Sequence, residues 1–328
     1  MIKHISIVAL AGMLLGLTPM DKPLMAFEPE NPECIAPANP GGGWDFICRT
    51  TAKFLFDLDI IDDAMQVTNM SGGGGGVAFA YVTKERNDDN NLIVAASTST
   101  SARIAQGIYK GASKEDVHWL ATFGAEYGVI GVSSDSPYQN LGELMDAVVE
   151  SPRSVAFAGG SSVGGYDHIK AMLVARKAGL EDVKTMKYIA FSGGGEAVTA
   201  LLSNSVDAVT GDFSEMIGFL ESGDIRILAV LGPERLKNYA DIPTAKEQGY
   251  DVIGANWRGL YMPAGASDAA KTYWSNAIQK MTQSSQFQAA LDAAAMASFN
   301  NFGQDMDDFV AGSIRDIADL SREIGIMK

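Results

Sequence analysis

The sequence predicts an α/β protein of two lobes, each a mixed, mostly parallel sheet flanked by helices. Short strand-like runs alternate with helix-like segments, and the alternation occurs as two separate series. Long extended stretches at residues 119–132 and 255–263 are placed to cross between the lobes. A chain of 328 residues also exceeds what one hydrophobic core usually serves. We therefore expect a cleft between two lobes.

The first series opens the chain after residue 32. Its apolar runs are short and bounded by glycine, asparagine or serine, which is typical of buried strands, and helical spacing follows each one. The expected elements are a strand at 33–36, a helix at 45–58, a strand at 65–69, a helix at 77–86, a strand at 92–96 and a helix after 101.

The second series repeats this order after the first crossover. Its expected elements are strands at 154–160, 187–191, 206–212 and 225–232 with helices at 166–179, 196–204 and 214–222. Helical material follows the second crossover to the C-terminus. We assign residues 27–132 and 255–328 to lobe one and residues 133–254 to lobe two, with the crossovers as hinges.

The N-terminus has the layout of a secretory signal peptide. Lys3 precedes an apolar run from Ile5 to Leu17, which is shorter than the ~20 residues that span a bilayer. A small residue, Ala26, marks the expected cleavage site, so residues 1–26 are predicted to be removed. An uncleaved membrane anchor is the alternative. The mature chain is therefore expected to be exported.

The two cysteines lie on either side of a glycine-rich turn, in the stretch CIAPANPGGGWDFIC. Their spacing is too wide for a redox CxxC motif, and no further cysteine completes a zinc site. In an oxidising compartment Cys34 and Cys48 are expected to form a disulfide that clamps this turn. Two buried thiols are the alternative.

Composition excludes several classes of partner. The formal net charge is −15, which argues against nucleic acid and against anionic membrane surfaces. With 47% hydrophobic and 20% charged residues the chain is an ordinary globular protein. No cofactor or metal motif is present, and we expect neither.

Four loops of glycines and hydroxyls each follow a strand and open a helix: PGGGWD, NMSGGGGG, AGGSSVGG and FSGGG. Glycine lets the backbone approach a ligand, and a helix start presents unpaired N–H groups, so an anion is the natural guest. All four loops lie at the carboxyl ends of strands, where α/β sheets bind ligands. We expect them to converge on one cleft.

The anion is expected to be a carboxylate. None of the loops carries the lysine of a phosphate-binding P-loop. Gly73, Gly75 and Ala78 fit a loose dinucleotide fingerprint, which a run of glycines satisfies by chance. Arg258, in the second crossover, is placed to reach the cleft; alternatively it pairs with an acidic neighbour.

An enzyme is the alternative from another class. An exported α/β hydrolase would use Ser161 or Ser162 as nucleophile with His168 or His118 as base. The nucleophile-elbow pattern G-x-S-x-G does not occur. Residues as close together as Ser161 and His168 more readily cap a helix than form a triad. We therefore expect no catalysis.

The loops together resemble the substrate-binding proteins of tripartite tricarboxylate transporters, also called the Bug family. The matching motifs are Pro40-Gly-Gly-Gly-Trp-Asp45, Asn69-Met-Ser-Gly-Gly-Gly-Gly-Gly76, Gly160-Ser-Ser-Val-Gly-Gly-Tyr-Asp-His168, Phe191-Ser-Gly-Gly-Gly-Glu-Ala-Val-Thr-Ala-Leu-Leu202, Val206-Asp-Ala208, Pro243-Thr-Ala-Lys-Glu-Gln-Gly249 and Trp257-Arg-Gly259 with Pro263. They occur in order over residues 33–265. The opening with paired cysteines is most similar to the branch that handles tricarboxylates such as citrate.

The resemblance implies a two-lobed periplasmic receptor of the Venus-flytrap type, type II-like. Such a receptor, here expected to be a monomer, closes on a small carboxylate and delivers it to a permease of one large and one small subunit. A tricarboxylate is favoured and a dicarboxylate comes next. Carried onto this chain, the resemblance places the ligand against Gly41, Gly42, Gly43, Trp44, Asp45, Thr98, Ser99, Ser161, Ser162, Gly164 and Asp212, to which we add Arg258.

Several of these roles have structural alternatives. Trp44 is expected to form an apolar wall, or else to pack under its loop. Asp45 contacts the ligand or caps the following helix. Asp212 beside an anion requires a water or a ligand hydroxyl between them. The five glycines after Ser71 depart from the family's usual pattern of glycines mixed with alanine or proline.

Overall fold

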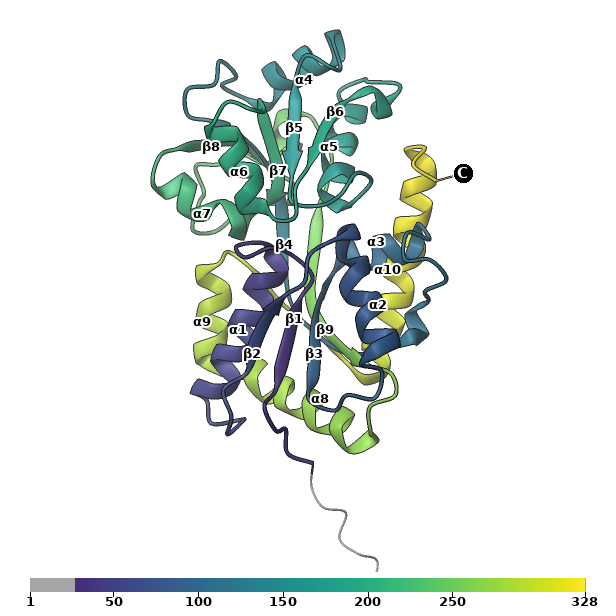
Figure 1. The fold of residues 1–328 in the computed structure, drawn as a ribbon. Coiled ribbons are helices and arrows are strands. Elements are labelled where there is room, and N and C mark those ends of the chain that lie inside the picture. The colour runs from purple at the N-terminus through teal and green to yellow at the C-terminus, as the bar shows by residue number, and fades with distance from the viewer. Residues whose placement is uncertain (1–26, 328) are drawn as a thin grey trace, which may run out of the picture.

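The computed structural model describes residues 27–327, which form two lobes stacked end to end (Figure 1). The predicted signal peptide, residues 1–26, lies outside the described residues. Strands alternate with helices through most of the chain, which confirms the predicted α/β class. Across residues 27–327, no helix has the length and apolar character needed to cross a membrane.

The first lobe is built on a mixed sheet. β1 (Glu33–Ala36) pairs in parallel with β2 (Gln66–Asn69) and with β3 (Leu92–Ser97), and β3 pairs antiparallel with β9 (Ala255–Pro263). β3 is buried along its whole length, as its sequence LIVAAS requires. The helices of this lobe are α1 (Gly43–Asp57), α2 (Gly76–Glu85), α3 (Thr98–Ala105), α8 (Asp268–Thr282), α9 (Ser285–Ala293) and α10 (Gly303–Glu323).

The second lobe has a smaller sheet. β5 (Ala156–Gly159) pairs in parallel with β6 (Lys187–Ala190) and with β7 (Ala208–Asp212). β8 (Ile225–Val230) does not extend this parallel series but pairs antiparallel with β4 (Val117–Ser133). The helices here are α4 (Leu141–Glu150), α5 (Tyr166–Lys177), α6 (Gly194–Leu202) and α7 (Phe213–Glu221); short 3₁₀ turns lie at Gly73–Gly75, Lys114–Asp116, Val183–Thr185 and Lys246–Gln248.

β4 belongs to both lobes. It pairs antiparallel with β9 up to Tyr127, and from Gly128 it pairs with β7 and β8. The change of partner therefore comes a few residues before the boundary at 132 expected from sequence. A side chain at Gly128 would bring its Cβ within 2.4 Å of Cδ of Lys170, so glycine suits the crossing point.

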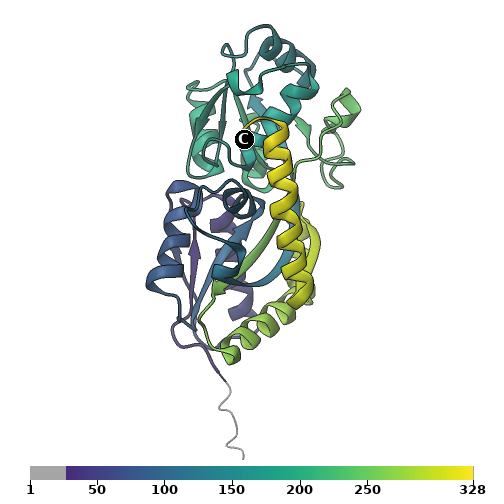
Figure 2. The same ribbon diagram turned by 90° about the vertical axis from the view of Figure 1, so that its right-hand side faces the viewer.

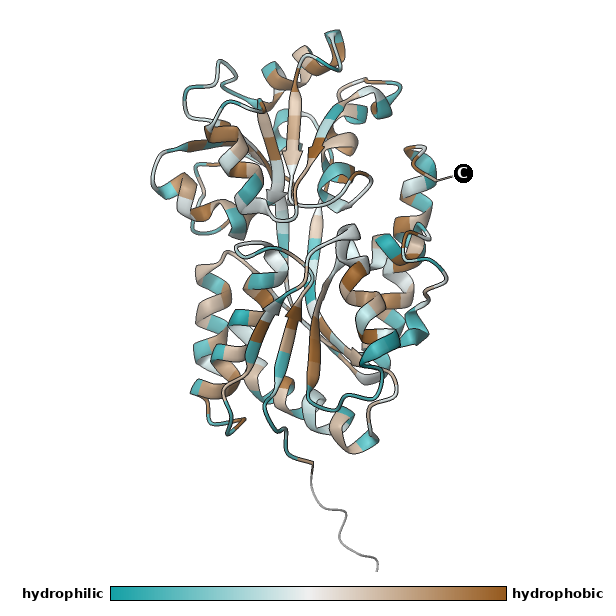
Figure 3. Cartoon of the chain, viewed as in Figure 1, coloured by the Kyte–Doolittle hydropathy of each residue, from teal (hydrophilic) through white to brown (hydrophobic). Residues whose placement is uncertain are grey.

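Each lobe has its own hydrophobic core. Hydrophobic residues concentrate on the sheet strands, and hydrophilic residues lie mainly on outward helix faces (Figure 3). In the first lobe Trp274 and Phe123 are fully buried between the sheet and α8 and α9. In the second lobe Phe157 and Ile169 are fully buried between β5 and α5.

α10 runs along both lobes (Figure 2). Near its start, Met306 and Val310 are buried in a cluster of the first lobe. Near its end, Ile317 belongs to the main cluster of the second lobe, together with Ile324 just beyond the helix. The C-terminal segment assigned from sequence to lobe one thus reaches the other lobe with its last turns.

The expectation of purely helical structure after residue 263 is wrong at one segment. β10 (Ala297–Phe302) pairs antiparallel with β4, and the hydroxyl of Thr122 accepts from the backbone N–H of Asn301 at 2.9 Å. The sequence ASFNNF has no β-branched residue and little alternation, so its strand character depends on the neighbouring edge of β4.

The disulfide between Cys34 and Cys48 is present, which confirms that prediction. It joins β1 to α1 with the two Cα atoms 5.6 Å apart, and both cysteines are fully buried. The bridge ties the strand before the first glycine loop to the helix after it. The loop between them, residues 37–42, therefore has a fixed entry and exit.

Replacing both cysteines with alanine is expected to lower the free energy of unfolding by about 3 kcal/mol, because the denatured chain loses a closed loop of about 15 residues. Urea unfolding of the double variant and the wild type measures the difference. Addition of dithiothreitol to the wild type serves as a second route to the same state. A loss below about 1 kcal/mol would contradict the clamping role.

Candidate functional site

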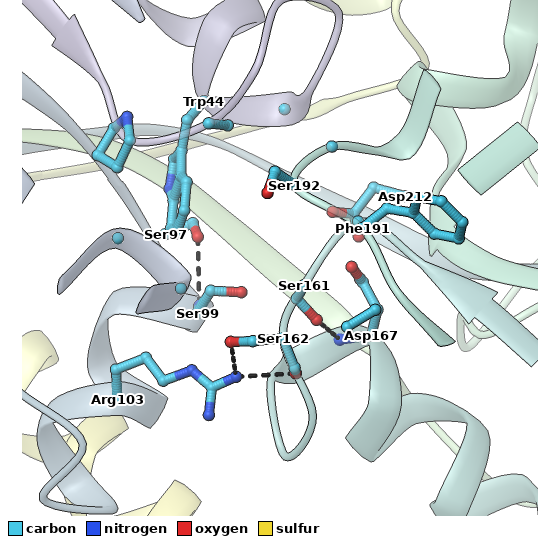
Figure 4. A pocket seen from close by; sticks show the side chains of 18 of the residues that line it. Trp44, Ser97, Ser99, Arg103, Ser161, Ser162, Asp167, Phe191, Ser192 and Asp212 are labelled. Carbon is cyan, nitrogen blue, oxygen red and sulfur yellow. Dashed lines mark hydrogen bonds between the residues drawn. The ribbon is translucent and has the colours of Figure 1, made fainter. Parts of the chain in front are cut away.

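A cavity of about 180 Å³ lies between the two lobes, at the carboxyl ends of their parallel strands (Figure 4). The lobes are closed over it. The Asn39 N–H donates to the Ser192 carbonyl at 2.9 Å, and Arg103 of α3 donates to the Ser162 carbonyl at 2.8 Å. The glycine loops thus converge on one cleft as the strand order predicts.

Seven of the twelve ligand-binding residues predicted from the sequence line this cavity, and the other five do not. The residues that line it are Gly43, Trp44, Ser99, Ser161, Ser162, Asp212 and Arg258. The residues that do not line it are Gly41, Gly42, Asp45, Thr98 and Gly164.

The first glycine loop is shaped by Asp45. The carboxylate of Asp45 accepts from the Gly41 N–H at 3.0 Å, from Arg49 Nε at 2.9 Å and from the Asn69 side chain at 2.9 Å. Gly41 has a φ of +83°, which favours glycine. Asp45 therefore supports the loop from behind. Trp44 projects to the cavity, and its indole Nε1 is buried without a partner among the described residues.

The five-glycine loop forms part of the cavity wall. Gly74 has a φ of +63°, and a Cβ there would lie 2.4 Å from the Ser162 hydroxyl of the other lobe. Gly75 has a φ of +92° and faces Trp44, whose ring would lie 3.2 Å from a Cβ. The positive φ of Gly74 and its approach to Ser162 of the other lobe both favour glycine at this point.

The start of α3 is held by neutral side chains. The Thr98 N–H donates to Asn256 Oδ1 at 3.1 Å, and the Thr98 hydroxyl accepts from the Trp257 N–H at 3.1 Å. Ser97 caps the helix by accepting from the Ser99 N–H at 3.2 Å. Thr98 is therefore a structural link to β9, and Ser99 presents its side chain to the cavity.

Arg103, on the last turn of α3, is a cavity residue that the sequence interpretation missed. It is only 2% exposed, and its guanidinium donates to Ser162 in the other lobe and to Gln106 Oε1 at 3.0 Å. Among residues 27–327 it has no carboxylate partner, and its Nε has no acceptor. Burial lowers the pKa of Arg103. The charge of Asp167 opposes this effect only in part. A buried cation that makes no salt bridge is costly, so this position suits an anionic ligand.

The loop after β5 does not form a catalytic triad. The Ser161 hydroxyl accepts from the Asp167 N–H at 3.0 Å, and His168 Nδ1 accepts from the Gly164 N–H at 3.0 Å. Burial and the charge of Arg103 lower the pKa of His168 to about 4. Within the described chain, neither His168 nor His118 hydrogen-bonds to Ser161 or Ser162, contrary to what the hydrolase alternative requires.

A buried network of charges lies at the wall of the cavity, which Asp167, Asp212 and Arg258 line. Lys170 Nζ contacts Asp167 Oδ1 at 2.9 Å and Asp212 Oδ1 at 2.7 Å. Arg258 contacts Asp212 Oδ2 at 2.8 Å and, through Nε, Glu126 Oε1 at 2.7 Å. Burial alone would raise the pKa of Asp212, but the charges of Lys170 and Arg258 outweigh it and lower the pKa. Both roles predicted for Arg258 are therefore observed, since it pairs with acidic neighbours and also lines the cavity.

Helix α1 receives its cap from the opposite lobe. Its N-cap residue is Gly42, which has no side chain, and the carboxylate of Glu215 on α7 accepts from the Gly43 N–H at 2.7 Å. Glu215 also lines the cavity. The start of α1, where the sequence predicts a ligand anion, therefore already contacts a carboxyl group of the protein itself.

Many of the cavity residues missed from sequence belong to the glycine loops, such as Gly72 to Gly75, Gly160 and Gly193; the others include a group of charged or polar residues within helices and strands. Arg103, Asp167, Glu215 and Asn256 belong to this group. No glycine loop or turn marks them. No group of three or more His, Cys, Asp or Glu residues in the described part of the chain could hold a metal ion.

Comparisons with known proteins agree with this geometry. The profile of the tripartite tricarboxylate transporter family receptors matches residues 58–326. The protein BugT of Bordetella pertussis strain Tohama I is 25% identical over 327 residues, which are 97% of this chain and 97% of BugT. The periplasmic binding protein BugD superposes with a TM-score of 0.81 at 18% identity, over 90% of this chain and 98% of that one. MatC of Rhodopseudomonas palustris with bound malate superposes with a TM-score of 0.77 at 19% identity, over 88% of this chain and 98% of that one.

Proposed function

The chain belongs to the tripartite tricarboxylate transporter family of receptors, and from this premise we propose that it is a periplasmic receptor for a small organic carboxylate. The buried guanidinium of Arg103 carries the proposal, because it lines the interlobe cavity and forms no salt bridge with any carboxylate among residues 27–327. A ligand carboxylate would supply the missing charge.

The ligand would contact both lobes at once. Its carboxylate would lie beside Arg103 with the hydroxyls of Ser99, Ser161 and Ser162 as further donors, and Trp44 would cover its apolar part. Such two-sided contact favours the closed state, so ligand binding would drive closure at the crossovers. Gly41, Gly42, Asp45, Thr98 and Gly164 would act indirectly, by shaping the loops.

The proposed identity of the acid follows from the resemblance of the sequence to one branch of the family. The segment with the paired cysteines is similar to the branch of the family that handles tricarboxylates, so we propose a tricarboxylate such as citrate first and a dicarboxylate second. Delivery to a membrane permease of one large and one small subunit follows from the resemblance to the family. The predicted signal peptide supports export to the periplasm, and we propose a monomer without catalytic activity.

A thermal-shift screen against a panel of organic acids tests this function. A ligand present at a hundred times its dissociation constant adds about 2.7 kcal/mol to the free energy of unfolding, which raises the melting temperature measurably. Citrate or another polycarboxylate is expected to give the largest rise. Shifts with sugars or nucleotides and none with any carboxylate would refute the proposal.

The variant Ser162→Ala tests whether this acid binds in the cavity. Loss of one hydrogen bond to a charged ligand costs about 1.5–3 kcal/mol, so its affinity for the same acid should fall by at least about tenfold. Ser285→Ala is the control, because Ser285 is exposed at the start of α9 and its hydroxyl contacts only Gln286. Equal affinities of the two variants would place the ligand elsewhere.

A further inference from the structure

Glu215 crosses the cleft and occupies the N-terminus of α1. Its Oε1 accepts from the Gly43 N–H at 2.7 Å, and its Oε2 accepts from the Asp212 N–H at 3.2 Å. A Cβ at Gly194 would lie 2.6 Å from this carboxyl group, so the start of α6 closes over it as well. A carboxylate of the protein therefore fills an anion position in the wall of the proposed ligand cavity.

The charges around Glu215 are mostly of its own sign. Asp212 of β7, Asp167 of α5 and Glu126 of β4 are negative, and Arg258 of β9 opposes them; α1 and α6 contribute backbone at this point. Burial, with the charges of Asp212 and Asp167, raises the pKa of Glu215 to about 7. Glu215 thus differs from Asp212, whose two oxygens are held by Lys170, Asn256 and Arg258.

We propose that Glu215 makes the cavity selective for the net charge of its ligand. While Glu215 is ionised, it disfavours a second ionised carboxylate of the ligand beside the start of α1. A polycarboxylate therefore binds with the uptake of one proton by Glu215. This inference rests on the proposed function. Two carboxylates sharing a site of low dielectric repel each other strongly unless one is protonated. The proton comes from solvent and goes to a carboxyl oxygen of Glu215.

Protonation would leave the interlobe contact in place. The neutral carboxyl group still accepts from the Gly43 N–H through its carbonyl oxygen, and its new O–H donates to the ligand carboxylate. A monocarboxylate held by Arg103 places no second charge near Glu215. The binding of polycarboxylates should therefore depend on pH, and the binding of monocarboxylates should not.

Isothermal titration calorimetry from pH 7 to pH 9 with citrate, malate and lactate tests this. For the wild type, the affinity for citrate or malate should fall by about fivefold from pH 7 to pH 8 and by about tenfold from pH 8 to pH 9, because each complex takes up the proton that free Glu215 loses around pH 7. Glu215→Gln should abolish this slope and bind the polycarboxylate more tightly than the wild type at pH 9. Lactate should show no slope with either protein.

Glu196→Gln is the matched control. Glu196 also lies in the second lobe and accepts from the first, from Asn39 Nδ2 at 2.6 Å, but it does not line the cavity. This variant should keep the wild-type slope. Equal slopes in the wild type and Glu215→Gln, or a similar slope with lactate, would overturn the inference and leave the proposed function intact. Binding of no carboxylate by any of the proteins would overturn both.

Discussion

Replacing Arg103 with methionine is expected to weaken carboxylate binding by about 2–5 kcal/mol, or roughly 30-fold to several thousand-fold in dissociation constant. Methionine fills a similar volume but removes the buried cation that a ligand carboxylate would neutralise. Calorimetry with the acid that gives the largest thermal shift measures the change. Arg103→Lys should recover part of the affinity, because it keeps the charge but loses the planar fork.

Arg103 also links the two lobes, so its control must break a similar link without a change of charge. Asn39→Ala does this, because Asn39 Nδ2 donates to Glu196 Oε1 of the second lobe at 2.6 Å and Asn39 does not line the cavity. That variant should lose much less affinity than Arg103→Met. If both variants lose affinity equally, Arg103 serves closure alone and does not bind the carboxylate.

Replacing Asp212 with alanine is expected to lower the free energy of unfolding by about 3–5 kcal/mol. The substitution removes the carboxylate that Lys170 and Arg258 share, and both cations are buried. Urea unfolding measures the loss. Asp241→Ala, at an exposed carboxylate of the second lobe, should change stability by less than about 0.5 kcal/mol.

The effect of Asp212 should depend on pH in a defined direction. Because the pKa of Asp212 is lowered in the folded protein, its stabilisation is fully present above the unfolded value of about 3.9. It is lost as the pH falls through the lower folded pKa. The difference in stability between the wild type and Asp212→Ala should therefore shrink below about pH 4; a difference that stays constant there would contradict a charge-based role.

Local patterns predicted the glycine loops and the disulfide, because both depend on residues close together in sequence. Cys34 and Cys48, which flank the loop PGGGWD, are only 14 residues apart in the sequence. Alternating apolar and glycine-rich segments likewise predicted the two series of strands and helices. β10 was missed because its pairing with β4, rather than its own composition, makes it a strand.

The charges of the site were not predictable in this way. Arg103 reads as an ordinary surface residue of a short helix, and its partner Ser162 is 59 residues away. Lys170 and Asp212 are 42 residues apart, and Arg258 and Glu126 are 132 apart. These partners lie far apart in the sequence, so only the folded structure brings them together.

Helix starts alone were also an incomplete guide to the ligand. α1 is capped by Glu215 of the other lobe, and α3 is held by Ser97 and Asn256. The N-terminus of α7 is likewise held, because the Ser214 N–H donates to Glu126 Oε2 at 3.0 Å. The N–H groups expected to bind a ligand anion are partly used by the protein, which leaves Arg103 as the clearest anion site.

The most direct test of the account is a crystal structure of the protein with the acid that gives the largest thermal shift. We predict a ligand enclosed between the lobes, with one carboxylate within hydrogen-bonding distance of Arg103 Nε and near the Ser162 hydroxyl. A ligand bound outside this cavity, or one whose carboxylate makes no contact with Arg103, would contradict it.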